Sequence, residues 1–395
     1  MIERDLTVRS LSPLALHDGR SRAQFTPGLD YIPGSALRGA AAAHYLRTYG
    51  KDEAFHALFV ADQSSFADLL PAMRELPGRL LPATACLCKR HGWDHTESLT
   101  DSLLRLALVE EMENTAPVDD VRWKHCPAPD CGQERDRAAG YATPNNAQIK
   151  VTSRLLTGTS IHRATGMVES GMLFSQEVLG EGQFFRGTVR IAGGEEAAGG
   201  LRARLEALLP VGERLRVGAA RSRGLGLVEV TDWRDPWAGL SLDSRWSQFK
   251  RAMAALWKAY EAKPGEACFS ITLESDLLLR DPAQRPITRL AEQEDVAELI
   301  GLEGVTLSRH VLRPTTVRGW NAQQGLPKET EPALGRGSVL FFRITTADEA
   351  AVRQQLAAIE AEGLGRRRSE GFGRVRVCDP FHYTFVLQEM KEANR

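Results

Sequence analysis

Two stretches of this chain repeat each other 147 residues apart. Gly218 to Val230 reads GAARSRGLGLVEV and Gly365 to Val377 reads GRRRSEGFGRVRV, with seven identities over thirteen aligned positions. Each copy ends in alternating valines, which is typical of a strand that follows a glycine-rich turn. A repeated loop and strand predict two related structural units in one chain, each of which ends in the same glycine-rich loop and strand.

The composition is that of an ordinary globular protein. The 395 residues are 43% hydrophobic and 26% charged, which suits two or three domains with cores of their own. No apolar stretch approaches the roughly 18 residues of a membrane span, and Met1 opens no leader pattern, so we expect a cytoplasmic protein without a membrane partner. Fifty basic and fifty-one acidic side chains leave a net charge of −1, so local patches would have to hold any polyanion.

The predicted elements follow one order in both halves, namely strand, helix, glycine loop and strand. Ser35 is the expected N-cap of the first helix, and Pro264-Gly265 marks the expected domain boundary. This order is typical of α+β ferredoxin-like units, whereas the pattern over 281–336 is unclear. The expected elements cover 2–11, 35–49, 149–156, 183–191, 201–209, 214–230, 244–262, 268–279, 338–345, 348–362 and 363–377.

The two halves therefore predict two ferredoxin-like (RNA-recognition-like) domains in tandem. The first would span residues 1–263 and carry a large cysteine-bearing insertion at about 50–147. The second, more divergent domain would span 264–395.

Glycine pairs with one residue between them occur in both copies, at Gly224 and Gly226 and at Gly371 and Gly373. Glycine adopts positive φ and lets a ligand approach the backbone, and successive N–H groups can bind an anion. Guanidinium groups bind phosphate and stack on bases, so a phosphodiester backbone is the natural partner of the surrounding arginines. The alternative is a tight turn with a solvated rim of arginines. The arginines beside the loops are Arg214, Arg216, Arg221, Arg223, Arg366, Arg367, Arg368, Arg374 and Arg376.

Nucleotide-binding loops of two other kinds are excluded. A Walker loop needs Gly-Lys-Ser/Thr, which neither copy contains. A dinucleotide fingerprint runs strand, loop, helix, whereas these loops are predicted between a helix and a strand.

These loops resemble the C-terminal glycine-rich loop of the RAMP superfamily of CRISPR-associated proteins. Ile32 to Gly39 is similar to the turn into that family's first helix, and 159–166 with 171–177 resemble its hairpin "thumb", here about 157–175. Two such folds with a cysteine-bearing insertion most resemble the type III-D effector subunit that holds the 5′ end of the guide RNA. The resemblance implies an RNA-binding scaffold for antiviral defence in a ribonucleoprotein complex. Its partners would be guide RNA, other RAMP backbone subunits, a large polymerase-like subunit and, through the complex, target RNA.

Physical chemistry gives the matching residues roles in RNA binding. Arg38 lies in the first turn of a helix, where free N–H groups favour anions, although a surface salt bridge is an alternative. His162 and Arg163 supply a stacking plane and a cation for splayed nucleotides, unless they form an ordinary hairpin tip. The predicted RNA-binding residues are Arg38, His162, Arg163, Gly218, Arg221, Ser222, Arg223, Gly224, Gly226, Arg366, Arg367, Arg368, Gly371 and Gly373.

Catalysis is not expected. Metal-independent cleavage of RNA needs a general base near a 2′-hydroxyl and a cation for the phosphorane. His17 and His44 are the weak candidates for the base, and neither has an obvious partner. A metal-independent endoribonuclease that processes guide RNA is the alternative function.

Cysteines and histidines gather in two short segments of the insertion. Thiolate and imidazole ligands from two segments are typical of a structural zinc site, and we expect Cys88, Cys126 and Cys131 as ligands. His95 is the expected fourth ligand, with Cys86 and His91 as alternates. The competing interpretation is that these segments form two independent loops whose thiols are simply buried. Cys268 and Cys378, each beside apolar strand residues, are expected to be buried core cysteines of that kind.

Overall fold

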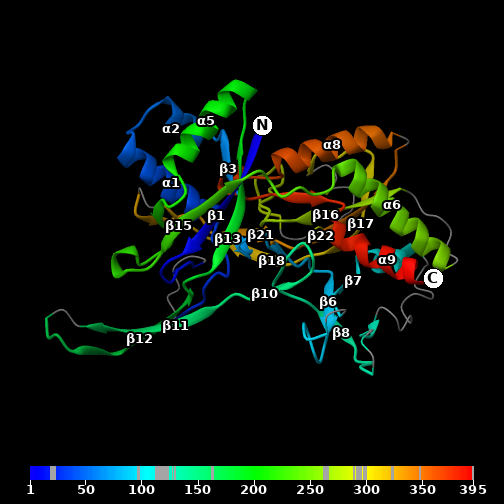
Figure 1. The fold of residues 1–395 in the computed structure, drawn as a ribbon, viewed down its shortest axis with the longest axis horizontal. Helices are drawn as coiled ribbons and strands as arrows, with labels where there is room; N and C mark the ends of the chain where they lie inside the picture. Colours follow the sequence, from blue (N-terminus) through cyan, green and yellow to red (C-terminus); the bar gives the residue numbers. More distant parts are fainter. Residues whose placement is uncertain are drawn as a thin grey trace.

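The protein has a mixed α/β fold with several antiparallel sheets, seen here in a computed structural model (Figure 1). None of the helices in the described part of the chain is long and apolar enough to cross a membrane. The structure describes residues 1–17, 24–95, 98–111, 124–126, 128, 130–161, 164–260, 267–287, 290, 296, 300–321, 324–346 and 348–393.

The first sheet has six strands, with β1 (Ile2–Ser10) at its centre. Helices α1 (Gly34–Thr48), α2 (Glu53–Phe59) and α5 (Glu195–Leu208) supply apolar residues to its core. The other strands in spatial order are β14 (Arg214–Arg216) and β15 (Leu227–Arg234) on one side of β1, then β13 (Phe184–Ile191) and β3 (Ser64–Phe66) on the other, with β4 (Leu70–Ala72) also paired to β13.

The alternation of side chains along β1 explains how the sheet is covered. Leu6 and Val8 are fully buried in the core that the helices share, whereas Thr7 and Arg9 belong to the opposite face because strand residues alternate. Arg9 is exposed at the end of that opposite face. The sheet therefore has one apolar, helix-covered face and one polar face.

The first helix begins one residue earlier than the sequence predicts, so Ser35 is not its N-cap. Pro33 occupies that position, and the N–H of Gly34 donates to Asp68 Oδ1 at 2.7 Å. The carboxylate of a residue 34 positions away supplies the cap that a local serine was expected to give. Local sequence rules do not detect a cap of this kind.

Part of the predicted insertion belongs to the first sheet, because β3 and β4 both pair with β13. Further along the chain, helix α3 (Leu103–Glu111) packs in the apolar core of the second half. The remaining strands form two small sheets, β5 (Arg79–Leu80), β9 (Tyr141–Ala142) and β10 (Gln148–Ile149), and β7 (Thr100–Asp101), β6 (Ala85–Cys88) and β8 (Arg135–Arg137).

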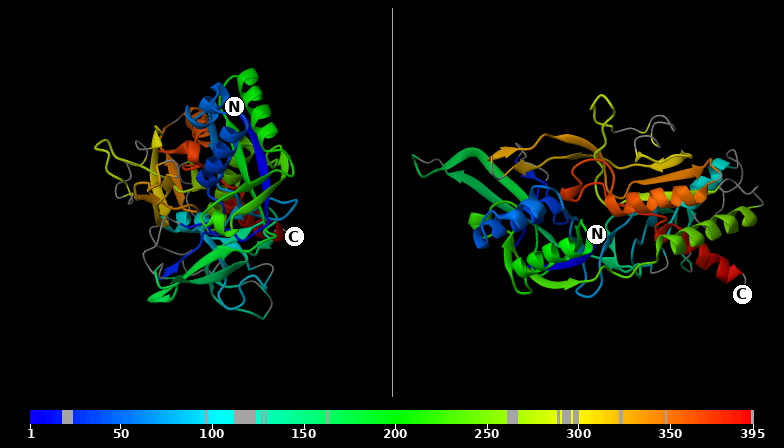
Figure 2. Two further views of the ribbon diagram at one scale, coloured as in Figure 1. Left: turned by 90° about the vertical axis from the view of Figure 1, so that its left-hand side faces the viewer. Right: turned by 90° about the horizontal axis from the view of Figure 1, so that it is seen from above.

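A long hairpin leaves the first sheet. Its strands β11 (Ser153–Ile161) and β12 (Val168–Leu179) pair antiparallel, and β2 (Phe25–Thr26) runs parallel beside β12. The hairpin reaches away from the body of the protein at the lower left of Figure 1 and the left end of the right-hand view in Figure 2. It contains the segment predicted to be thumb-like.

The second sheet has four antiparallel strands, and its helices lie at the opposite end of the molecule from the hairpin (Figure 2). The helix α6 begins two residues before the predicted start, where Ser241 accepts the N–H of Ser244. The elements are β17 (Val305–Val311), β22 (Val339–Ile344), β16 (Cys268–Leu273) and β23 (Val375–Val377) in spatial order, with helices α6 (Leu242–Ala259), α8 (Glu349–Glu362) and α9 (Pro380–Ala393).

The unclear stretch 281–336 contains β17 and four further strands. The further strands are β18 (Pro314–Val317) paired with β21 (Glu331–Leu334), and β19 (Trp320–Asn321) paired with β20 (Leu326–Pro327).

The two halves repeat a hydrogen-bond pattern as well as a sequence. Leu14 and Leu179 exchange both backbone hydrogen bonds, at 2.9 and 3.0 Å, where the chain leaves β1 and meets the end of β12. Leu277 and Leu334 do the same, at 2.8 and 3.0 Å, where the chain leaves β16 and meets the end of β21. The pair β18 and β21 thus holds the same position in the second half as the long hairpin in the first.

Candidate functional site

The two glycine loops have the same backbone conformation. Ala220 and Arg367 are left-handed with φ of 53° and 57°, and each precedes a 3₁₀ turn, η2 (Arg221–Arg223) or η3 (Arg368–Glu370). The sequence repeat is therefore a structural repeat. The glycines with positive φ at matching positions are Gly218 and Gly365, Gly224 and Gly371, and Gly226 and Gly373.

The last glycine of each loop is required by the turn. A Cβ on Gly226 would lie 2.2 Å from the Val217 oxygen, and one on Gly373 would lie 1.8 Å from the Leu364 oxygen. These contacts match the alternative interpretation in which the glycines form a tight turn. The two loops can therefore differ in function only through the side chains that each exposes on its outer side.

The first loop presents cations to solvent. Arg221, Ser222, Arg223 and Gly224 are all exposed, and Arg216 braces the loop by donating from Nη1 to the Arg221 oxygen at 3.4 Å. Within the described residues, neither Arg221 nor Arg223 is engaged in an ion pair, in contrast to many other arginines of this chain. The first loop thus exposes two guanidinium groups that no carboxylate among the described residues pairs with.

The second loop is packed against the first sheet. Ser65 of β3 donates to the Arg368 oxygen at 2.7 Å, and a Cβ on Gly371 would lie 2.2 Å from the Phe66 oxygen. Arg374 is buried, and its Nη2 donates to the Thr188 oxygen at 3.1 Å. Burial and the nearby Arg190 lower the pKa of Arg374 to about 9. This loop joins the two halves of the chain.

Four arginines around the second loop have acidic partners. Nearby carboxylates therefore compensate their charge, which differs from the first loop. The pairs are Arg366 with Glu331 at 3.9 Å, Arg367 with Glu370 at 2.9 Å, Arg368 with Glu362 at 3.7 Å and Arg376 with Glu360 at 3.2 Å.

The carboxylate of Glu370 accepts hydrogen bonds from two cations of this region, Arg367 and Lys328. Burial alone would raise its pKa, but hydrogen bonds from Arg367 and Lys328 lower the pKa from 4.5 to about 2. Since the folded pKa is depressed, the ionised carboxylate stabilises the fold fully above about pH 4.5. That stabilisation is lost as the pH falls toward 2.

Replacing Glu370 with Gln is therefore expected to lower the free energy of unfolding at pH 7 by about 3 kcal/mol or less. The variant should also lose less stability than the original protein between pH 4.5 and 2, because it has no carboxylate there to protonate. Urea unfolding at several pH values measures both effects. Glu362→Gln is the matched control, since the Glu362 side chain is 71% exposed and should contribute little. Equal effects of the two substitutions would contradict this account.

Arg38, predicted to bind a phosphate, contacts its own chain. Its Nη2 donates to the Phe59 oxygen at 2.9 Å and to Asp62 Oδ1 at 3.0 Å, which is the alternative that the sequence left open. His162 and Arg163 lie outside the described residues.

The two histidines proposed as weak catalytic candidates contact different neighbours. His17 Nδ1 lies 3.2 Å from the Pro27 oxygen, and His44 Nε2 lies 3.6 Å from Glu213.

Four of the predicted metal ligands come together. Within the described part of the chain, one ligand atom from each of Cys88, His95, Cys126 and Cys131 lies within 4.8 Å of the others. The two sulfurs of Cys88 and Cys131 are 3.7 Å apart, and His95 Nδ1 is 3.3 Å from the Cys126 sulfur. A tetrahedron with metal–sulfur bonds of about 2.3 Å has a sulfur–sulfur edge of about 3.8 Å, so the cluster has the dimensions to hold a metal ion.

The local chain prepares Cys88 for this role. Burial raises the pKa of its thiol, but the N–H groups of His91 and Arg90 donate to the sulfur, and the net direction is downward. The rings of His91 and His95 stack with centroids 4.3 Å apart, so His91 packs beside the cluster and is not part of it.

The other cysteines are outside the cluster. Cys86 donates to the Thr84 oxygen at 3.5 Å, and burial raises its pKa to about 11. Cys268 and Cys378 are buried among apolar residues, as the sequence predicts.

A buried hydrogen-bond chain connects Asp101 of β7, in the segment that contains the cysteine and histidine cluster, to the second sheet. His382 Nδ1 lies 3.0 Å from Asp101 Oδ2, and His382 Nε2 lies 2.7 Å from Thr272 Oγ1. The side chains of His382 and Asp101 are 0% and 1% exposed. These two contacts join residues 281 and 110 positions apart, so local sequence patterns do not reveal them.

A second connection that the sequence did not reveal centres on Arg336. Its Nη2 is 2.8 Å from Asp68 Oδ2, and its guanidinium carbon is 3.5 Å from the centroid of the Tyr31 ring. Because Asp68 also caps α1 through Gly34, one carboxylate links the first helix to the second half.

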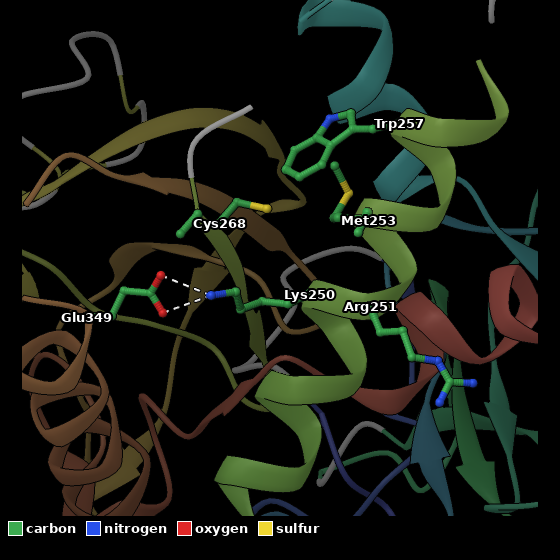
Figure 3. A pocket seen from close by; sticks show the side chains of 8 residues that line it. Lys250, Arg251, Met253, Trp257, Cys268 and Glu349 are labelled. Carbon is green, nitrogen blue, oxygen red and sulfur yellow. Dashed lines mark hydrogen bonds and ion pairs between the residues drawn. The ribbon is translucent and has the colours of Figure 1, made fainter. Parts of the chain in front are cut away.

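A cavity of about 490 Å³ lies beside α6 (Figure 3). Met253, Trp257 and Cys268 give it an apolar wall, and Lys250 is paired with Glu349 at 2.9 Å at its side. None of the predicted RNA-binding or metal-binding residues lines it.

One segment of the chain is similar to a known protein family. Residues 242–378 match the model of a family described as CRISPR-associated protein (Cas_Cmr3). This part of the chain is thus similar to a family of CRISPR-associated proteins, in agreement with the resemblance seen in the sequence. The matched range includes the second glycine loop but neither the first loop nor the cysteine and histidine cluster.

The solved structures to which the chain is similar include chains of the type III-B Cmr-beta complex and Cmr4. A chain of Cmr-beta bound to cognate target RNA and AMPPnP is 11% identical, with 91% of this chain and 89% of that chain covered and a TM-score of 0.45. A chain of apo Cmr-beta is 14% identical, with coverage of 59% and 97% and a TM-score of 0.34. Oligomeric Cmr4 from Pyrococcus furiosus is 12% identical, with coverage of 60% and 99% and a TM-score of 0.28. No curated protein matches the chain.

Proposed function

We propose that this protein is a non-catalytic, RNA-binding structural subunit of a type III CRISPR effector complex. More narrowly, we propose the type III-D subunit that holds the 5′ end of the guide RNA. The observation that carries the proposal is the first glycine loop, whose exposed Arg221 and Arg223 lack ion-pair partners in the described part of the chain. The family match over 242–378 supports the class of complex. Other RAMP subunits, the polymerase-like subunit and target RNA are the proposed partners.

The architecture behind this proposal is a pair of tandem ferredoxin-like domains, about 1–263 and 264–395. In the first sheet β1 lies between β15 and β13, and in the second sheet β16 lies between β23 and β22. The strands β3 and β17 lie beside β13 and β22 on the side away from β1 and β16. This common order, the repeated loops and the matching leucine pairs support the proposal.

The two loops have different roles in this proposal. The first loop binds the phosphodiester backbone, because its guanidinium groups are exposed and uncompensated. The second loop joins the domains, since its arginines are paired with carboxylates and Gly371 lies against Phe66. Arg366, Arg367 and Arg368 are therefore not included in the proposed RNA contact.

Replacing Arg221 and Arg223 together with Ala is expected to weaken RNA binding and its salt dependence. Each lost contact to a single-strand phosphate removes about 0.7 from the slope of log affinity against log salt, so the double variant should lose about 1.4. Fluorescence anisotropy with labelled single-stranded RNA at several salt concentrations measures both. Arg368→Ala is the matched control, because Arg368 holds the position of Arg221 in the second loop. An unchanged slope in the double variant would contradict the proposal.

The cysteine and histidine cluster is proposed to hold a structural zinc ion. Three thiolates and one imidazole fill a tetrahedral site, which leaves no position for a substrate or a reactive water. Zinc therefore stabilises the insertion in this proposal and takes no part in RNA chemistry.

The absence of catalysis is proposed from the arrangement of the basic groups. Cleavage needs a base and a cation within hydrogen-bond reach of one phosphate, yet His17 and His44 contact separate parts of the chain. Exposed arginines without a positioned base bind the ground state of RNA and do not lower the barrier.

Guide-like RNA is therefore expected to remain intact during incubation with the purified protein, with or without divalent metal. Gel electrophoresis of end-labelled RNA measures this, and His17→Ala should change affinity at most. Site-specific cleavage that disappears in His17→Ala or His44→Ala would contradict the non-catalytic scaffold and support the endoribonuclease as the function.

A further inference from the structure

A row of four side chains crosses the first sheet on its polar face. Arg9 of β1 is the Cα partner of Phe184 in β13 and of Glu229 in β15, and Glu229 is the partner of Arg214 in β14. Residues directly opposite in antiparallel strands share a face, so these four side chains form one line, here called the cross-strand row.

The cross-strand row is open to solvent and carries a free cation. Arg9 is exposed, and its guanidinium carbon lies 5.8 Å from the centroid of the Phe184 ring. The structure, in the part it describes, gives Arg9 no ion pair. Arg214 is 63% exposed and is paired with Glu229 at 3.3 Å. The row therefore combines an aromatic ring, an unpaired guanidinium and a surface ion pair.

The neighbouring row on the same face is already occupied. Arg186 of β13 is buried, and its Nη2 donates to the Arg74 oxygen at 3.0 Å while its Nε donates to Thr7 Oγ1 at 2.8 Å. The chain at Arg74 thus covers this part of the polar face. The cross-strand row is the accessible end of the face.

The row connects two elements that the proposed function places near RNA. At one end Arg216, two residues from Arg214 and on the same face, donates to the Arg221 oxygen of the first loop. At the other end Phe184 begins β13 directly after the hairpin, whose base is held where Ser10 Oγ donates to the Gly180 oxygen at 3.1 Å. Three strand spacings of about 4.8 Å give the row a length of about 14 Å.

We propose that the cross-strand row is an RNA-binding subsite that carries a single strand from the first loop to the foot of the hairpin. One base stacks on Phe184, and the adjacent phosphate binds Arg9. Three arginines against one carboxylate on this path favour a polyanion, and a ring beside a guanidinium is suited to a base and its phosphate. This inference rests on the RNA-binding function proposed above.

Two substitutions in the full-length chain test the subsite with labelled oligouridylate as the probe. Phe184→Leu keeps apolar bulk but removes the aromatic face, and it is expected to weaken binding about tenfold without changing the salt slope. Arg9→Ala is expected to lower the salt slope by about 0.7. Arg251→Ala, an exposed arginine on α6, is the control and should change neither quantity. Thermal unfolding checks that each variant is folded.

The outcomes separate this inference from the function on which it rests. If Arg221 and Arg223 matter for binding but Arg9 and Phe184 do not, the subsite is wrong and the RNA-binding function stands. If oligouridylate does not bind the unmodified chain at all, both are wrong. Loss of affinity in Phe184→Leu with a slope change in Arg9→Ala supports the subsite.

Discussion

Replacing both Cys126 and Cys131 with Ser is expected to abolish zinc binding and to unfold the segment around residues 80–140. The two residues supply half of the ligands in the cluster, and one of them, Cys126, is only 5% exposed. The apolar cluster around the metal-ligand candidates is small and is shared with Phe381 of α9, so metal binding should provide much of the free energy that folds this segment. Apparent zinc-binding free energies in small peptides are on the order of 10 kcal/mol, which exceeds the effect of most single contacts.

Elemental analysis and hydrogen exchange measure this result. Protein purified without chelators should contain about one zinc per chain, and the double variant should contain none. Amide protection should fall chiefly between residues 80 and 140. Cys86→Ser is the matched control, since Cys86 lies two residues from Cys88 on β6 but outside the cluster, and it should retain the metal. Metal-free protein with unaltered stability would show that the thiols are merely buried.

The loss of structure in the Cys126 and Cys131 double variant is expected to extend beyond the insertion. Asp101 follows the metal-binding strand and contacts His382 of α9 inside the protein. Unfolding of the insertion would leave the buried His382 without its carboxylate partner, which costs free energy. We therefore expect reduced protection in α9 as well.

The sequence could predict features that depend on local pattern. The repeated loops, the positions of β1, β13, β15 and β22 and the set of four candidate metal ligands follow from glycine spacing, alternation and cysteine spacing. In each case the information lies within a few residues or in a direct repeat. The structure brings Cys88, His95, Cys126 and Cys131 together as that spacing predicts.

Features that depend on distant contacts could not be predicted in this way. The carboxylate of Asp68 replaces Ser35 as the cap of α1, and Arg336 reaches the same carboxylate from the second half. The sequence does not predict β3 and β4 as strands of the first sheet, because their short runs have no clear alternation of apolar and polar residues. They therefore fall within the predicted insertion. Only their pairing with β13 reveals their place in the sheet.

The different roles of the two loops are the clearest example. Seven shared residues predict the same backbone, and that prediction is confirmed by the φ values. The same identities predict one function for both loops, whereas their surroundings differ. Gly371 faces the Phe66 oxygen, while the equivalent Gly224 faces open space. The surroundings of a loop are set by tertiary packing, which a local motif does not encode.

Replacing Gly371 with Ala is accordingly expected to destabilise the protein far more than replacing Gly224 with Ala. Both glycines have positive φ, 97° and 85°, so both substitutions carry a backbone strain of about 1–2 kcal/mol. A Cβ on Gly371 would also lie 2.2 Å from the Phe66 oxygen and 3.4 Å from the Ala67 Cα, whereas a Cβ on Gly224 would meet no described atom within 4 Å.

The difference between the two variants isolates the contact between the halves of the chain. Backbone atoms cannot move aside as a flexible side chain can, so Gly371→Ala must shift the second loop away from β3. That shift would break the hydrogen bond from Ser65 to the Arg368 oxygen and expose the buried guanidinium of Arg374. We expect an additional loss of at least about 2 kcal/mol relative to Gly224→Ala, measured by urea unfolding. Equal losses would mean that the halves are held together elsewhere, through Arg336 and His382, and that the second loop is free to bind a ligand.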